Sequence, residues 1–75
     1  MRATEALKDI IHAQNLTIAK VADRLNIARN ALNMRLNRDN DITMGKVVDI
    51  ARSLDYKIVI MPRDVKLPKD SYEVE

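Results

Sequence analysis

One face of a helix predicted over about residues 28–37 gathers three asparagines and a methionine at intervals of three and four residues. Its members are Asn30, Asn33, Met34 and Asn37, with Arg29 and Arg35 on the flanks. Asparagine is a mediocre helix former, so three on one face of a short helix call for a reason beyond a solvated surface, which is the plain alternative. Carboxamide and guanidinium groups form the paired, planar hydrogen bonds that can read the edges of nucleic-acid bases.

Other kinds of chemistry have little support in this sequence. The chain has no cysteine and one histidine, which excludes disulfides, thiolate zinc sites, cysteine nucleophiles and histidine-rich metal sites. His12 and Asp9 can be written as an acid–base pair, but no nucleophile, phosphate-cradling loop or metal cluster accompanies them. Asp39-Asn40-Asp41 resembles the start of a calcium loop without its glycine and its later glutamate. We therefore expect no enzyme, no metal and no cofactor.

The charge is divided unevenly along the 75 residues, of which 47% are hydrophobic and 32% charged. Residues 1–38 carry seven basic and three acidic side chains, a balance of +4, whereas residues 39–75 carry six and eight, a balance of −2. The first half thus offers a candidate surface for a polyanion. No apolar run approaches the ~18 residues of a membrane span, and the charged N-terminus does not fit a signal peptide. A single-domain, cytoplasmic protein without membrane contact is expected.

Four helix signatures precede residue 55, which predicts a mainly α fold of four to five helices. Thr4, Thr17 and Thr43 are placed to cap helix starts. Asn15 and Asn26 suit the left-handed conformation in which many helices end. The positions expected to face inward are Leu7, Ile10, Ile11 and Gln14, then Ile18, Val21, Ala22 and Leu25, then Ala28, Leu32 and Leu36, and finally Val47, Ile50, Ala51 and Leu54.

After Leu54 the period of the pattern changes from 3.6 to two, which predicts a β-strand over about residues 56–61. Residues 63–75 are polar and interrupted by proline, so they form a poor partner strand and we expect a flexible tail there. Pairing with a second copy across a two-fold axis would satisfy the strand's free backbone groups. The predicted dimerisation residues are Tyr56, Ile58, Val59, Ile60 and Met61. The alternative is a strand lying flat on the monomer's own helices. The predicted domain is residues 1–62.

The segment TIAKVADRLNIARNALNMRLN, residues 17–37, has the pattern of a short helix, a sharp turn and a second helix with a polar outer face. Ala22 is small where the two helices would cross, and Asn26 would take the turn. The segment resembles the lambda-repressor-like helix-turn-helix family of DNA-binding regulators, of the Cro and phage-repressor type. The similarity extends over about residues 4–55.

Three positions depart from the family pattern. Asn26 stands where glycine is usual, and Asn tolerates the same backbone conformation at modest cost. Ile18 stands where a glutamine commonly supports a phosphate contact, so phosphate anchoring would depend on backbone N–H groups and on charges elsewhere. Ala28 replaces a common serine or threonine, which weakens the cap of the second helix.

The resemblance implies a homodimer that binds an inverted-repeat operator in double-stranded DNA, as a repressor or, by touching polymerase, an activator. The base-reading positions that it implies are Ala28, Arg29, Asn30, Asn33 and Met34. The implied phosphate contacts are Thr17, Asn37, Arg38, Asn40, Thr43 and Lys46. Lys20 and Arg24 are expected on an ordinary solvent face.

A second hypothesis comes from a different class of protein. Some family members are antitoxins, in which a terminal segment masks a partner protein. The apolar residues 56–61 and the acidic tail with Tyr72, Glu73 and Glu75 would then be the masking element. A strand that pairs with its own copy favours the regulator alone, whereas a strand left exposed favours a protein partner.

Overall fold

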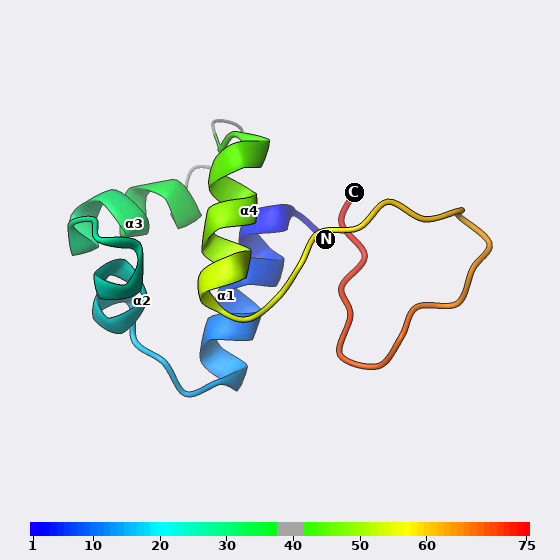
Figure 1. Cartoon of the computed structure of the whole chain (residues 1–75), viewed down its shortest axis with the longest axis horizontal. Helices are drawn as coiled ribbons and strands as arrows, with labels where there is room; N and C mark the ends of the chain where they lie inside the picture. The colour runs from blue at the N-terminus through cyan, green and yellow to red at the C-terminus, as the bar shows by residue number, and fades with distance from the viewer. Residues whose placement is uncertain (38–41) are drawn as a thin grey trace.

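Four helices form the body of the protein in a computed structural model that describes residues 1–37 and 42–75. The helices are α1 (Ala3–Ala13), α2 (Ile18–Leu25), α3 (Arg29–Asn37) and α4 (Met44–Ser53) (Figure 1). Helix α3 packs against α1 and α2, and α4 packs against the same two helices. The described residues contain no strand. The prediction of a mainly α fold is confirmed with four helices, the smaller of the two expected numbers.

The helix boundaries follow the capping residues at four of the predicted positions. The side chains of Thr17 and Thr43 accept hydrogen bonds from the backbone N–H groups of Lys20 (3.2 Å) and Lys46 (3.3 Å). These bonds satisfy N–H groups that have no partner within the helix. Asn15 and Asn26 both have φ of 56°, as predicted from their tolerance of the left-handed region. The two threonine caps and the two asparagine ends are confirmed.

The predicted start of the first helix was wrong. Thr4 lies inside α1 and is buried, because the helix begins earlier, with Arg2 as its N-cap. The N–H of Arg2 donates to the carboxylate of Glu5 at 3.0 Å, and an acidic group in the first turn also favours the positive end of the helix dipole. Helix α3 begins at Arg29, one residue after the expected start, and the Ala28 carbonyl accepts from the N–H of Leu32 at 3.2 Å.

The core lies between the four helices and consists of aliphatic side chains. Its buried members are Leu7, Ile10, Ile11, Val21, Ala22, Leu32, Leu36, Val47, Ile50, Ala51 and Leu54. All of these positions were predicted to face inward, and Ile18 and Leu25 pack against them partly buried. Ala28 and Gln14 are exceptions, since both are exposed. Gln14 still contributes, because its Nε2 donates to the Leu54 carbonyl at 2.9 Å.

Residues 54–75 leave α4 and form a wide loop that returns to the N-terminus (Figure 1). Residues 56–61 have no strand pairing within the single chain, and the side chain of Ile60 is 101% exposed. They therefore do not lie flat on the monomer's own helices, as one alternative supposed. The predicted strand needs a second chain and stays a prediction.

The predicted flexible tail makes contacts near Tyr72 and at its last residue. The ring of Tyr72 packs partly buried against the core, with its centroid 6.4 Å from that of Tyr56 and a tilt of 53° between the rings. The Tyr56 hydroxyl donates to the Asp70 carbonyl at 3.2 Å. The N–H of Glu75 donates to the Met1 carbonyl at 2.8 Å, which closes the loop onto the start of the chain.

The docked position of Tyr72 predicts a change in the tail at alkaline pH. Burial, and then the nearby Tyr56, Asp9 and Asp70, raise the pKa of the Tyr72 phenol above its usual value of 10.0, because they disfavour the phenolate. Because the pKa is higher in the docked state, docking of Tyr72 is fully stabilising below pH 10.0. This stabilisation is lost as the pH rises from 10.0 through the docked-state pKa. Titration by tyrosinate absorbance should therefore show a late-ionising component, which Tyr72→Phe removes. A Tyr72→Phe variant that keeps the late component would contradict this docking.

Candidate nucleic-acid interface

The turn between α2 and α3 fixes the relation of these two helices. At its centre Asn26 adopts a left-handed conformation, and its N–H donates to the Asp23 carbonyl at 3.1 Å. The next N–H, of Ile27, donates to the Ala22 carbonyl at 3.1 Å, so the last turn of α2 is closed by backbone bonds. Ala22 is buried at the contact of α2 with its neighbours, as expected of a small residue at a close helix crossing.

Helix α3 presents its polar face to solvent and its apolar face to the core. Leu32 and Leu36 are each 0% exposed, whereas Met34 on the outer side is 52% exposed. The structure brings the five predicted base-reading residues together at the exposed start and outer side of α3. These are Ala28, Arg29, Asn30, Asn33 and Met34. Arg35, expected on a flank, is partly buried.

Two asparagines on this face are joined to each other and to α1. The Asn37 side chain donates through Nδ2 to the carbonyl oxygen of Asn33 at 2.8 Å and to its Oδ1 at 3.0 Å. The Nζ of Lys8 donates to Oδ1 of Asn37 at 3.3 Å. Lys8 did not stand out in the sequence, because 29 residues separate it from Asn37 and no local pattern joins them.

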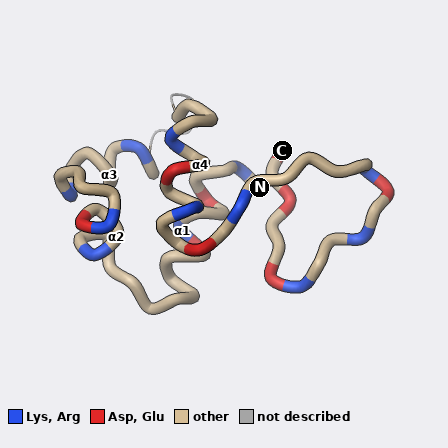
Figure 2. The backbone as a smooth tube through the Cα atoms, viewed as in Figure 1, with Lys and Arg blue, Asp and Glu red and all other residues tan. Residues whose placement is uncertain are grey.

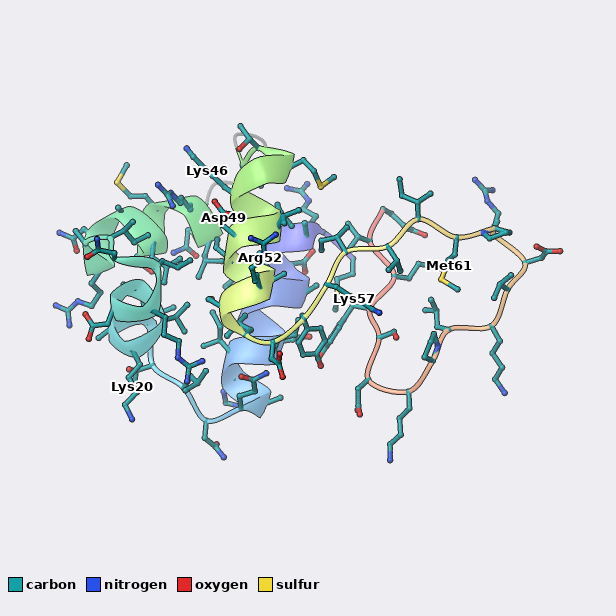
Figure 3. All side chains as sticks on the ribbon, in the orientation of Figure 1. Lys20, Lys46, Asp49, Arg52, Lys57 and Met61 are labelled. Carbon is teal, nitrogen blue, oxygen red and sulfur yellow. The ribbon has the colours of Figure 1, made fainter. Side chains whose placement is uncertain are left out.

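Apart from Asn37, the last residue of α3, the predicted phosphate contacts lie at helix starts or outside the described residues. Thr17 and Thr43 cap α2 and α4, where free N–H groups and the helix dipole favour an anion. Figure 3 shows Lys46 extending from the first turn of α4 on the side of α3, whereas Lys20 extends from α2 away from α3. Arg38 and Asn40 lie outside the described residues, as does the Asp39-Asn40-Asp41 turn.

Positive charge predominates on α2 and α3. Their helical residues carry four basic side chains, Lys20, Arg24, Arg29 and Arg35, against the single acid Asp23 (Figure 2). Such a local excess attracts a polyanion and is weakened by salt. Acidic side chains are more frequent in the loop after α4 than on α2 and α3, and they are mixed there with basic ones (Figure 2).

Arg24 has a structural role that the sequence did not indicate. It was predicted on a plain solvent face, but its Nη1 donates to the Ser53 carbonyl at 3.0 Å. Gln14, the C-cap of α1, donates in the same way to the Leu54 carbonyl. The C-terminal end of α4 is therefore held by side-chain donors from α2 and from the end of α1. The positive charge of Arg24 also complements the negative end of the α4 dipole. These bonds connect α4 to the helices that position α3.

The loop after α4 borders an apolar cavity of about 800 Å³ on the side of α1 and α4. Its wall includes Leu7 and Val47 from the helices and Ile58 and Tyr72 from the loop. Several apolar side chains of the loop stay exposed in the single chain, namely Ile58, Val59, Ile60, Val65, Leu67 and Val74. The predicted dimerisation residues are therefore accessible, apart from the partly buried Tyr56 and Met61.

Two further properties concern metals and membranes. Within residues 1–37 and 42–75, no group of three or more histidine or acidic side chains is arranged to hold a metal ion. None of the helices described by the structure combines the length and apolar character that crossing a bilayer requires.

A sequence model of a family described as helix-turn-helix matches residues 7–60 of the chain. The match begins within α1 and ends within the loop after α4, so it covers the α2–turn–α3 unit and both helices that support it. Neither the curated proteins nor the solved structures gave a match.

Proposed function

Because the chain belongs to the helix-turn-helix family of the lambda-repressor and Cro type, a family of DNA-binding regulators rather than enzymes, we propose that it binds a specific operator through α3. In this proposal α3 enters the major groove, and a homodimer reads an inverted repeat. The regulator acts as a repressor of the phage type, by occupying DNA that polymerase needs.

The exposed polar face of α3 is the observation that carries this proposal. A helix held by two fully buried leucines presents Arg29, Asn30 and Asn33 to solvent, with Met34 beside them. Arginine pairs with guanine O6 and N7, asparagine pairs with adenine N6 and N7, and an apolar group packs on the thymine methyl. The capped starts of α2 and α4 and the Lys46 ammonium would hold the phosphates on either side.

Dimerisation through residues 56–61 completes the proposal. The apolar side chains of Ile58 and Ile60 are 45% and 101% exposed in the single chain, and a second copy would cover them while pairing the free backbone groups. A two-fold dimer places two recognition helices about 34 Å apart, which sets the half-sites about one DNA turn apart.

Selection from a random duplex pool tests the proposal directly. We expect an enriched inverted repeat that the dimer binds at least ~1,000-fold more tightly than random DNA at physiological salt. The mass of the free protein and of the complex should be measured in parallel. The proposal would be contradicted if no sequence is enriched and the protein binds all duplexes weakly, with binding that added salt abolishes.

Arg29→Ala should weaken operator binding by about 10- to 100-fold while changing random-DNA binding little, because a two-pronged base contact contributes ~1–3 kcal/mol of discrimination. Lys46→Ala is the matched control, since a lost phosphate contact weakens binding to all duplexes similarly and lowers the salt slope by about one. Titration of operator and random duplexes across a salt series measures both effects. Equal losses on the two duplexes for Arg29→Ala would remove Arg29 from the base-reading set.

The second candidate function is a protein-interaction module that masks a partner with its C-terminal segment. The exposed apolar side chains of residues 58–60 and the cavity beside them favour it, because an uncovered apolar surface marks an interaction site. The two candidates differ in what covers this surface. A self-dimer covers it in the regulator, whereas purified protein of the second kind is monomeric and keeps it exposed.

A further inference from the structure

One hydrogen bond from α1 to α3 and two within α3 form what we call the Lys8–Asn37–Asn33 chain. It runs from Nζ of Lys8 to Oδ1 of Asn37, and from Nδ2 of Asn37 to both the carbonyl oxygen and Oδ1 of Asn33. All three side chains lie at the solvent-exposed surface. The last of them is one of the proposed base-reading residues.

The two ends of the chain fix the orientation of the Asn37 carboxamide. A lysine ammonium has only donors, and a backbone carbonyl has only acceptors. Asn37 lies between them, so its oxygen must face Lys8 and its nitrogen must face Asn33. That nitrogen donates to both Asn33 oxygens, the backbone carbonyl and Oδ1. To donate to a DNA phosphate, Asn37 would have to weaken these bonds within the protein.

The orientation of Asn37 also determines that of Asn33. Because Nδ2 of Asn37 donates to it, Oδ1 of Asn33 must face the following turn of α3. An amide oxygen has two lone pairs, so this oxygen keeps one acceptor position. Among the described residues no group accepts from Nδ2 of Asn33, which leaves a donor and an acceptor side by side. Adenine N7 and N6 require this pair of groups in the major groove.

We infer that Asn37 and Lys8 are positioning residues that hold Asn33 ready to read one base, and that Asn37 is not a phosphate contact. The inference rests on the proposed function, because it assigns roles within the same DNA-binding face. Holding the carboxamide before binding reduces the rotamer freedom lost on contact with the base. The benefit is restricted to the base pair that Asn33 faces, and this restriction makes it measurable.

Base preference at one operator position is the quantity to measure. Asn33→Ala first identifies the operator position that Asn33 reads. At that position the ratio of the affinities for the preferred and the substituted base pair falls to about one in this variant. The same ratio is then measured for the wild type, Asn37→Ala, Lys8→Met and Lys20→Met. Lys20→Met is the matched control, because it removes the same charge from α2, where the side chain extends away from α3. A ratio cancels any uniform loss of affinity that follows from the removed charge.

We expect Asn37→Ala to reduce the base-preference ratio about tenfold, Lys8→Met to reduce it by a smaller factor, and Lys20→Met to leave it unchanged. Preferences at the other operator positions stay as in the wild type. Asn37→Ala should fold normally, because alanine is a better helix former than asparagine, and thermal unfolding of the variant checks this.

Two results would overturn the inference, and they are distinguishable. If both variants keep the wild-type ratio, the positioning role fails. A uniform loss of affinity on every duplex, with a salt slope lower by about one for Lys8→Met alone, would then assign the two residues to phosphate contacts instead. If the wild type enriches no sequence, or Asn33→Ala removes no preference, base reading by α3 fails, and this inference fails with it.

Discussion

Leu32→Ala is expected to lower the free energy of unfolding by about 2–5 kcal/mol, the range for truncating a buried leucine. Leu32 is 0% exposed and lies in the core on the inner side of α3. Its loss removes apolar contacts and leaves a cavity, because the neighbouring helices are held by capped ends and can collapse only partly. A domain of this size has a small margin of stability, so much of the variant should be unfolded at physiological temperature.

Urea unfolding followed by circular dichroism measures this effect. Met34→Ala is the matched control, because it removes a side chain of similar volume from the same helix at a position 52% exposed. Its free energy of unfolding should change by no more than about 0.5 kcal/mol. Similar changes for the two variants would contradict the assignment of inner and outer faces of α3. Met34→Ala should instead weaken operator binding while the protein stays folded, since it removes a proposed thymine contact.

Ile60→Asp is expected to raise the dissociation constant of the homodimer by about 100-fold or more. The side chain of Ile60 is 101% exposed in the single chain, so the substitution has no packing to disturb in the monomer. In the proposed dimer the carboxylate would be buried without a partner, which costs several kcal/mol. Operator affinity should fall as well, because each monomer then binds only one half-site.

Sedimentation equilibrium over a range of concentrations measures the change in association. Ala13→Asp is a suitable control, since it adds the same charge at an exposed position of α1 and removes little apolar surface. An unchanged dimer in Ile60→Asp would exclude strand pairing through residues 56–61. A wild type that is monomeric at all concentrations would instead favour the second candidate function, with a protein partner on the apolar loop.

Features that depend on neighbouring residues could be predicted without the fold. Thr17, Thr43, Asn15 and Asn26 mark helix ends because each acts on backbone groups a few residues away or on its own φ. The inner faces of the helices follow from a 3.6-residue period, which needs no knowledge of the packing. The family likeness rests on the same local pattern, and the match over residues 7–60 confirms it. Thr4 was misjudged because α1 begins earlier than expected, at a start where the N–H of Arg2 donates to the Glu5 carboxylate.

Contacts between distant side chains could not be predicted and are visible only in the folded chain. Lys8 reaches Asn37 across 29 positions, and Gln14 and Arg24 reach the end of α4 across 40 and 29. Tyr72 returns to the core although the tail around it is polar. No sequence period encodes such contacts, because they depend on the angles at which whole helices cross and on the path of the chain after α4. For this reason the sequence indicated the face of α3 that would read DNA, whereas only the folded chain revealed the residues that hold one of its asparagines in place.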